Sequence, residues 1–154
     1  MLVVCCWLLV ERPRLMEAFR RNILPKSFRD LEVWNKSIDL TTLVYNFTAT
    51  FPKQEIYGLS SQMRRAAVSI ASNIAEGSAR GTRSDFRQFV KQAQGSNAEL
   101  QTQILIAKRL GYADGRNPDE IETICTQIGG MLAGLSNYLA REVKANRSRP
   151  PLNN

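Results

Sequence analysis

The chain has 154 residues, the size of a single domain with one hydrophobic core. Its apolar fraction of 44% is ordinary for a globular protein, Gly and Pro are scarce, and alternating β-branched runs are lacking, which argues against disorder and all-β folds and predicts a mostly helical chain. The formal net charge of +7 favours a polyanionic partner, whereas the absence of histidine removes the commonest general base and metal ligand.

Residues 1–27 are predicted to form an N-terminal extension outside the folded domain. Residues 1–10 are strongly apolar, but they are shorter than the roughly 20 residues of a membrane span, and they lack the basic start and the cleavage site of a signal peptide. We therefore expect no membrane partner. Three interpretations stay open: a weak anchor, a segment buried in an assembly, and a wrongly assigned start with Met16 as the alternative start.

A first helix is predicted after Asp30, a suitable N-cap, and it should end near Thr50 because Pro52 disfavours helical geometry at the residue before it. Alternating steps of three and four residues define the stripe that we expect to face the core. This stripe comprises Leu31, Trp34, Ile38, Thr41, Tyr45 and Thr48. The residues that widen the apolar surface are Leu40, Leu43, Val44 and Phe47. The helix is therefore expected to contact the core broadly.

A second helix is predicted to be capped by Ser60 or Ser61 and to end within residues 77–81, where glycines tolerate left-handed backbone. Its predicted core stripe comprises Met63, Ala67, Ile70, Ile74 and Gly77. Short side chains flank this stripe and would let a neighbouring helix approach closely. They belong to Ala66, Ser69, Ala71, Ser72 and Ala75.

Thr82 or Ser84 is predicted to open a third helix that continues to about residue 110, with Asp85 in its first turn, where a negative charge meets the positive end of the helix dipole. The pair Gly95-Ser96 in the middle costs up to ~1 kcal/mol of helix propensity relative to Ala, so we expect a close packing contact there. The predicted inner face comprises Phe86, Phe89, Val90, Ala93, Asn97, Leu100, Ile104 and Ala107.

Asn117 as cap, Pro118 at the first position and two carboxylates behind them predict a fourth helix that runs to about Val143. Its apolar stripe comprises Ile121, Ile124, Cys125, Ile128, Met131, Leu135, Tyr138 and Leu139. Short links between successive helices favour antiparallel neighbours, so the expected fold is all-α, an up-down-up-down four-helix bundle over residues 28–145. Residues 146–154, with prolines and arginines, are expected to be a disordered basic tail.

The cysteines, Cys5, Cys6 and Cys125, have neither the spacing of a metal site nor that of a disulfide framework. With histidine absent as well, we expect no metal and no cofactor.

Cations gather in two zones of the sequence, and these are the candidate nucleic-acid contacts. The first zone surrounds the turn between the second and third helices, and the second lies at the end of the fourth helix. The candidates are Arg64, Arg65, Arg80, Arg83, Arg87, Lys91, Arg141, Lys144 and Arg147. A solvated face or subunit salt bridges are the alternative, favoured for Arg64 and Arg65. Aromatic stacking pairs and helix-turn-helix geometry are lacking, so charge and shape rather than base identity should govern binding.

Polar residues on the second and third helices are predicted to form a network between helices or subunits. They are Ser69, Asn73, Glu76, Glu99 and Gln103. A catalytic carboxylate pair is the sharper alternative, but the surrounding sequence offers it no nucleophile, metal set or histidine. We therefore expect a protein without enzymatic activity.

Several segments of the chain carry a resemblance to a known family. They are Phe28-Arg29-Asp30-Leu31-Glu32-Val33-Trp34, Tyr57-Gly58-Leu59, Arg64-Arg65-Ala66-Ala67-Val68-Ser69-Ile70, Ser72-Asn73-Ile74-Ala75-Glu76-Gly77, and Gly95-Ser96 with Glu99. Over about residues 27–143 the chain resembles the four-helix-bundle family of 23S rRNA intervening-sequence proteins, with residues 73–77 as the most recognisable block.

The resemblance implies a small bacterial cytoplasmic protein that forms a homo-oligomer, with a pentamer as the expected state, and carries a positively charged surface. A related group, the accessory variability determinants of diversity-generating retroelements, binds nucleic acid and partners a reverse transcriptase. Two hypotheses follow. The first is a non-enzymatic oligomer that binds RNA or RNA–DNA, and the alternative is a scaffold oligomer whose partner is a protein such as a reverse transcriptase.

Overall fold

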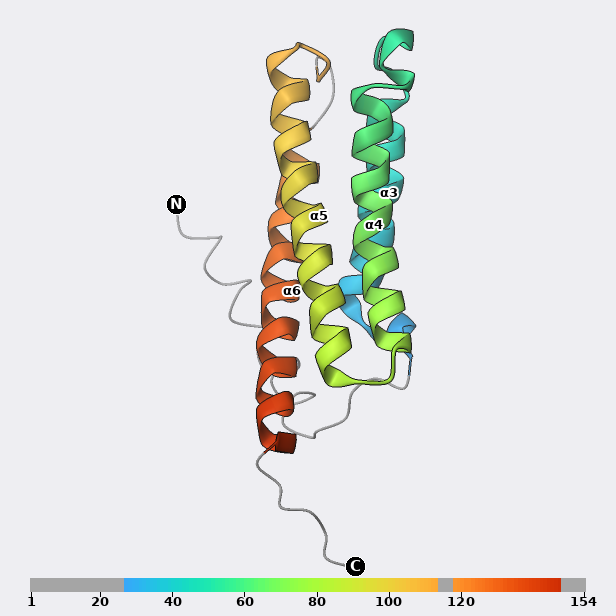
Figure 1. Cartoon of the computed structure of the whole chain (residues 1–154). Helices are drawn as coiled ribbons and strands as arrows, with labels where there is room; N and C mark the ends of the chain where they lie inside the picture. Colours follow the sequence, from blue (N-terminus) through green and yellow to red (C-terminus); the bar gives the residue numbers. More distant parts are fainter. Residues whose placement is uncertain (1–26, 114–117, 148–154) are drawn as a thin grey trace, which may run out of the picture.

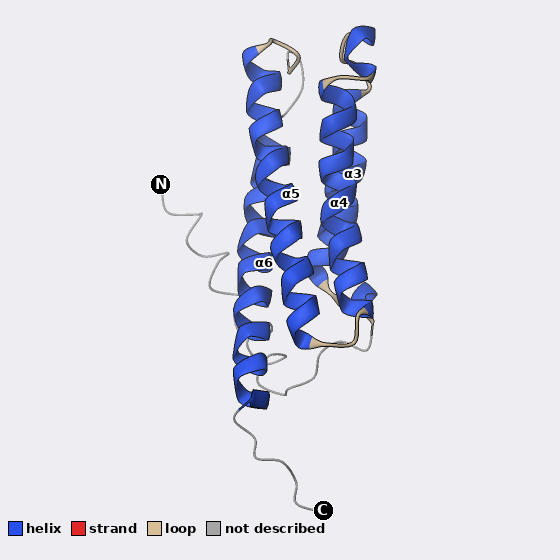
Figure 2. Cartoon of the chain, in the orientation of Figure 1, coloured by secondary structure: helices blue, strands red, loops and turns tan. Residues whose placement is uncertain are grey.

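The computed structural model describes residues 27–113 and 118–147, and this part of the chain is an antiparallel bundle of four α-helices (Figure 1). The elements in chain order are η1 (Phe28–Asp30), α3 (Glu32–Thr48), η2 (Lys53–Ile56), α4 (Leu59–Ala79), α5 (Arg83–Arg109) and α6 (Pro118–Arg147). The described residues contain no strand (Figure 2). The predicted all-α, four-helix class is confirmed. Most of the predicted extension and tail, together with the predicted cap Asn117, lies outside the described residues.

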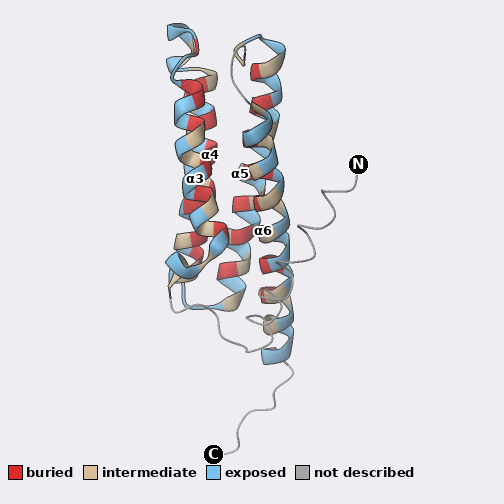
Figure 3. Cartoon of the chain, turned by 180° about the vertical axis from the view of Figure 1, so that it is seen from behind, coloured by how far each residue is buried: buried red, intermediate tan, exposed pale blue. Residues whose placement is uncertain are grey.

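Each helix packs against two others, which closes the bundle around one core. α4 lies against α3 and α5, and α6 lies against α5 and α3. Their facing sides carry the buried residues (Figure 3). Fully buried aliphatic side chains come from all four helices, among them Leu40, Met63, Leu100, Ile104 and Leu132. Burying one such side chain stabilises the fold by about 1.5–3 kcal/mol, so this layer dominates the packing energy.

The predicted core stripe of the second helix is confirmed, because Met63, Ala67, Ile70, Ile74 and Gly77 are all buried in α4. The predicted inner face of the third helix is also buried in α5, apart from a half-buried Phe89.

The predicted core stripe of the first helix is wrong in its main members. Ile38 and Tyr45 are 41% and 46% exposed, whereas Leu40 and Val44 are fully buried. α3 carries two apolar stripes side by side, and periodicity gives no information on which of them faces the core. The residues predicted to widen the stripe turn out to face the core. Of the predicted stripe, Thr48 is buried and Leu31 and Trp34 pack against the core, whereas Ile38 and Tyr45 lie on an exposed flank.

Two predicted helix caps are also wrong. Asp30 belongs to η1 and accepts a hydrogen bond from the Ser27 N–H, and α3 begins after Leu31, which provides no side-chain cap. Ser60 is buried inside α4, which begins one residue earlier. There Glu55 Oε2 accepts a hydrogen bond from the Leu59 N–H at 2.8 Å, so a side chain from η2 serves as the cap. In contrast, Thr82 caps α5 as predicted.

Of the pair Gly95-Ser96, where a close contact is expected, Ser96 makes one, since its Oγ lies 2.9 Å from Ser69 Oγ on α4, but Gly95 does not. A Cβ atom added at this exposed glycine would meet nothing within 4 Å. The cost of a glycine in the middle of α5 therefore has no compensation inside the described bundle.

Candidate nucleic-acid interface

The turn between α4 and α5 is built by residues with defined backbone roles. Gly81 has φ +80°, which side-chain-bearing residues rarely adopt, and it reverses the chain after α4. Thr82 Oγ1 then accepts a hydrogen bond from the Asp85 N–H at 3.0 Å and donates one to Asp85 Oδ2 at 2.7 Å. Asp85 is thereby engaged in the cap, and its carboxylate is not paired with a neighbouring cation in the described structure.

Gly77 brings α4 and α5 close together just before this turn. A Cβ atom at this position would lie 2.6 Å from Phe89 Cβ and 2.9 Å from Phe86 Cδ2. Phe89 Cβ is bonded to the α5 backbone, and the backbone oxygen of Phe86 would also lie 3.3 Å away, so these atoms have little freedom to move. The last turns of α4 are therefore held firmly against the first turns of α5, which fixes the positions of the cations on both.

Arg80 is the most strongly engaged cation at this end. Its Nη2 donates to Glu76 Oε1 one turn earlier, and its guanidinium carbon lies 5.2 Å from the centre of the Phe89 ring. The pair is exposed, so it adds little to stability, but it offsets the charge of Arg80. Arg80 thus contributes less to the local positive field than its position in the sequence suggests.

Arg83 and Arg87 lie on the first two turns of α5, beside α6. Both are half-buried. Burial and the nearby Glu142 raise the pKa of the Tyr138 phenol, while Arg83 lowers it, which places Arg83 next to that tyrosine and glutamate on α6. The buried Nε of Arg87 has no hydrogen-bond partner in the described structure. Lys91, one turn further along α5, is exposed.

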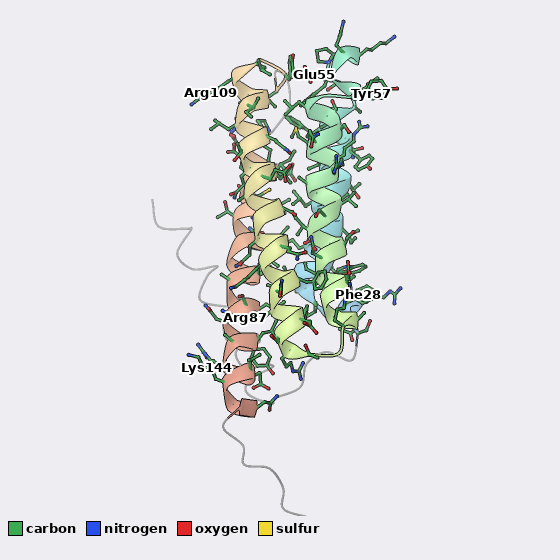
Figure 4. All side chains as sticks on the ribbon, in the orientation of Figure 1. Phe28, Glu55, Tyr57, Arg87, Arg109 and Lys144 are labelled. Carbon is green, nitrogen blue, oxygen red and sulfur yellow. The ribbon has the colours of Figure 1, made fainter. Side chains whose placement is uncertain are left out.

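The last turns of α6 bring further cations to the same end of the bundle. Arg141 and Lys144 are exposed. Arg147 is the last residue of α6, and its side chain lies outside the described part. Figure 4 places the labelled Arg87 and Lys144 together at the end where α5 begins and α6 finishes. We call the set Arg80, Arg83, Arg87, Lys91, Arg141 and Lys144 the basic end.

Arg64 and Arg65 lie elsewhere. They lie 16 and 15 residues before Arg80, which corresponds to roughly 23 Å along the helix axis. The Nε of Arg64 donates to Thr48 Oγ1 at 2.8 Å, and its guanidinium lies 4.9 Å from the centre of the Tyr45 ring, so Arg64 ties α4 to α3. Arg65 is exposed. The structure thus divides the sequence-predicted cations into two separate groups.

The five residues of the expected polar network also divide. Ser69 and Asn73 meet, because Asn73 Nδ2 donates to Ser69 O at 2.8 Å and to Ser69 Oγ at 3.0 Å. Ser69 Oγ lies 2.9 Å from Ser96 Oγ, which links α4 to α5. Glu99 pairs with Gln103 further along α5, at 2.9 Å. The fifth residue, Glu76, points to Arg80, so two carboxylates do not converge.

Sequence reasoning missed two polar contacts between helices. One is the bond between Ser69 and Ser96, because the expected polar network included Ser69 but not Ser96. The other is Asn97, which is 4% exposed and donates from Nδ2 to the Cys125 carbonyl oxygen at 3.0 Å. A polar residue on a predicted apolar stripe was the available signal, since a buried amide requires a partner.

The described residues offer little to covalent or metal chemistry. Burial, with a smaller contribution from Glu122, raises the pKa of the Cys125 thiol to about 12, so this sulfur stays protonated at neutral pH. Within residues 27–113 and 118–147, clusters of three or more potential His, Cys, Asp or Glu ligands are absent. In the same part of the chain, a helix with the length and hydropathy needed to cross a bilayer is also lacking.

Comparisons with known proteins give a family and a fold. The model of the family described as 23S rRNA-intervening sequence protein matches residues 29–134. A solved structure from Bacteroides thetaiotaomicron, described as a protein with unknown function from the S23 ribosomal protein family, is similar with a TM-score of 0.62 and 23% identity. The match covers 68% of this chain and 95% of that one, and at this identity it supports the fold alone. A comparison with curated proteins finds no match.

Proposed function

We propose that this chain, which belongs to the 23S rRNA-intervening sequence protein family, is a non-enzymatic, homo-oligomeric, cytoplasmic bundle that binds the backbone of RNA or of RNA–DNA through its basic end. The observation that carries the proposal is the gathering of cations at one end, on α5, on α6 and at the C-cap of α4. Cations clustered in this way bind phosphates by releasing condensed counterions.

The charge balance of the basic end supports this role. Of the carboxylates at this end, Glu76 is paired with Arg80, Asp85 is held in the α5 cap, Asp30 accepts from the Ser27 N–H, and Glu142 lies beside Tyr138. Glu32, at the start of α3, is exposed. Arg83, Arg87, Lys91 and Arg141 remain in excess. The cations stand on helical turns rather than on loops, so their relative positions are defined before a ligand arrives.

The second candidate function is that of a scaffold whose partner is another protein, such as a reverse transcriptase. One observation favours it. At the end of the bundle opposite the basic end, Tyr57 is 94% exposed and its neighbour Ile56 is 54% exposed, next to a turn held by Glu55 (Figure 4). An exposed aromatic side chain on a well-held turn is typical of a protein contact.

Binding of a structured RNA measured across a salt series tests the nucleic-acid proposal. We expect the logarithm of affinity to fall linearly with the logarithm of salt concentration, with a slope of about 0.7–0.9 per phosphate contacted. The triple variant Arg83→Glu, Arg87→Glu and Arg141→Glu should lose binding while keeping its helical content and its mass in solution.

The matched control reverses two exposed cations at the opposite end, Lys53→Glu and Arg109→Glu. This control should keep most of the RNA affinity. The remaining loss should become smaller as salt is added. A wild-type chain that binds RNA with a flat salt dependence, or a control that loses as much affinity as the basic-end variant, would overturn the proposal.

A further inference from the structure

A shallow groove lies on the outside of the bundle, where α3, η2 and the first half of α4 meet. It has a volume of about 430 Å³, and its lining includes Tyr45, Ile56, Arg64, Arg65 and Val68. We call it the α3–α4 groove. Val68 is 42% exposed and Tyr45 is 46% exposed, so the groove presents apolar surface from two helices to solvent.

Helical periodicity continues across this exposed surface. On α3 it is formed by the flank stripe that includes Ile38 and Tyr45, both of them large and partly exposed. On α4 the outward residues follow steps of four and three, which is the spacing of a helix–helix seam. They are Ser61, Arg65, Val68, Ser72, Ala75 and Ala79. All of these residues except Arg65 are apolar or small, which favours the packing of another helix here.

A second exposed stripe runs along α5 with the same period. It comprises Gln92, Gly95, Glu99, Thr102 and Ile106, with Leu110 beyond the last turn. Ile106 is 43% exposed and Leu110 is 53% exposed. Gly95 lies in this stripe with open space around it, so its missing side chain suits the close approach of a helix from outside the chain.

The charges on the α3–α4 groove and on the α5 stripe indicate which of these surfaces can pack against each other. The groove contributes Arg64 and Arg65 and contains no carboxylate among its lining residues, so two grooves placed face to face would oppose like charges. The α5 stripe instead carries Glu99, which is exposed and has Gln103 as its recorded partner. Arg65 has no recorded ion-pair partner in the described structure.

We propose that the α3–α4 groove of one copy of this chain receives the outer stripe of α5 from a second copy, with Arg65 facing Glu99 across the contact. The inference rests on the homo-oligomer in the proposed function and names its contact surface. Because the two surfaces differ, the contact is heterologous and repeats from copy to copy until it closes into a ring or continues as a filament. In a ring every copy has the same orientation to the axis, so the basic ends would form one circle.

Charge reversal on the full chain tests the contact, with molar mass measured by light scattering after size exclusion. The single variants Arg65→Glu and Glu99→Arg should each lower the mass towards that of a monomer while keeping helical content. Mixing the two single variants should restore assemblies that contain both chains, because each mismatched surface then finds its complement. An ion pair within one chain would not produce this recovery.

A second variant, Gly95→Leu, tests the same contact by adding a bulky side chain without changing any charge. It should also lower the mass, without lowering the thermal midpoint of the monomer, because the added side chain meets open space within the chain. Arg141→Glu at the basic end is the control and should leave the mass unchanged while weakening RNA binding.

A wild-type chain that is monomeric at high concentration, single variants that keep the wild-type mass, or a mixture that stays dissociated would each overturn this contact. RNA binding with a steep salt dependence would still stand in every one of those cases. Conversely, assembly without RNA binding would refute the proposed function and leave the contact intact.

Discussion

The two ends of the bundle contain the same kinds of charged residue but arrange them differently. At the end where α5 finishes and α6 begins, Lys108 lies 2.7 Å from Asp119 and 2.8 Å from Glu122. Glu55 there accepts hydrogen bonds from the Leu59 N–H and from the Tyr112 hydroxyl. At the basic end Arg80 is paired with Glu76, whereas Arg83, Arg87, Lys91 and Arg141 form no ion pair within residues 27–113 and 118–147. Local pairing, rather than the net charge of +7, therefore locates the candidate site.

Replacing Gly77 with Ala should have the largest effect on the basic end. The new Cβ would lie 2.6 Å from Phe89 Cβ, so α4 and α5 would have to separate, at a cost of about 1–3 kcal/mol of unfolding free energy. Chemical denaturation with circular dichroism measures this. Gly58→Ala is the matched change at the other end. Its Cβ would meet the Glu55 carboxylate at the end of a flexible side chain. Moving that carboxylate breaks its bond to the Leu59 N–H, so the loss should be about 1 kcal/mol. Equal losses would contradict this difference in rigidity.

At the opposite end of the bundle, the removal of Glu55 should destabilise the fold. Its carboxylate caps α4 through the Leu59 N–H at 2.8 Å and accepts from Tyr112 at 3.2 Å, so Glu55→Ala should lower the unfolding free energy by about 1 kcal/mol. The change should also bring the raised pKa of the Tyr112 phenol, caused by burial and then by the charge of Glu55, closer to its ordinary value. Spectroscopic titration and denaturation check both effects. If this variant leaves RNA affinity unchanged, the end that contains Glu55 does not contribute to RNA binding.

The sequence predicted α4 well and α3 poorly for the same physical reason. α4 has one apolar stripe, from Met63 to Gly77, between faces of small and polar residues, so periodicity had a single solution. α3 has two stripes, and only the position of α4 and α6 decides that Leu40 rather than Ile38 is buried. The Glu55 cap was missed because its carboxylate reaches α4 from a preceding turn, outside the usual N-cap position.

For the candidate site, the sequence correctly predicted that Arg80, Arg83 and Arg87 lie near the turn, but it also assigned Arg64 and Arg65 to that zone and did not predict which cations are engaged. The Glu76–Arg80 pair was available from its spacing of four residues. The bond from Arg64 to Thr48 was not, because it joins two helices whose relative rotation follows from the packed core.

Releasing Arg80 from its ion pair with Glu76 should increase the excess of positive charge at the basic end. Glu76→Gln removes the carboxylate that engages Arg80 and leaves an exposed amide, so the basic end gains one available cation. We expect tighter RNA binding and a salt slope steeper by up to about 0.9, measured as in the salt series above. Glu122→Gln is the control, since it releases charge from Lys108 at the opposite end and should change RNA affinity little. An equal gain from both variants would show that net charge alone matters.

The smallest expected effect concerns the paired end itself. The Lys108 ammonium donates hydrogen bonds to Asp119 and to Glu122, and these bonds, the one to Asp119 first, raise its pKa above the ordinary value of 10.5. A raised folded-state pKa means that the pairs stabilise the fold fully below the pKa of the unfolded chain and lose this contribution as pH rises through the folded-state value. The difference in thermal midpoint between wild type and Lys108→Met should therefore be present at pH 8, shrink above about pH 10.5, and shrink also with added salt.

Arg109→Met is the matched control for that measurement, because Arg109 is the exposed neighbour of Lys108 and has no recorded carboxylate partner in the described structure. It should leave the midpoint at pH 8 close to that of wild type. If both variants shift the midpoint equally, the cations at this end act through general charge rather than through specific pairs. The contrast with the basic end would then depend on the number of carboxylates nearby and not on their geometry.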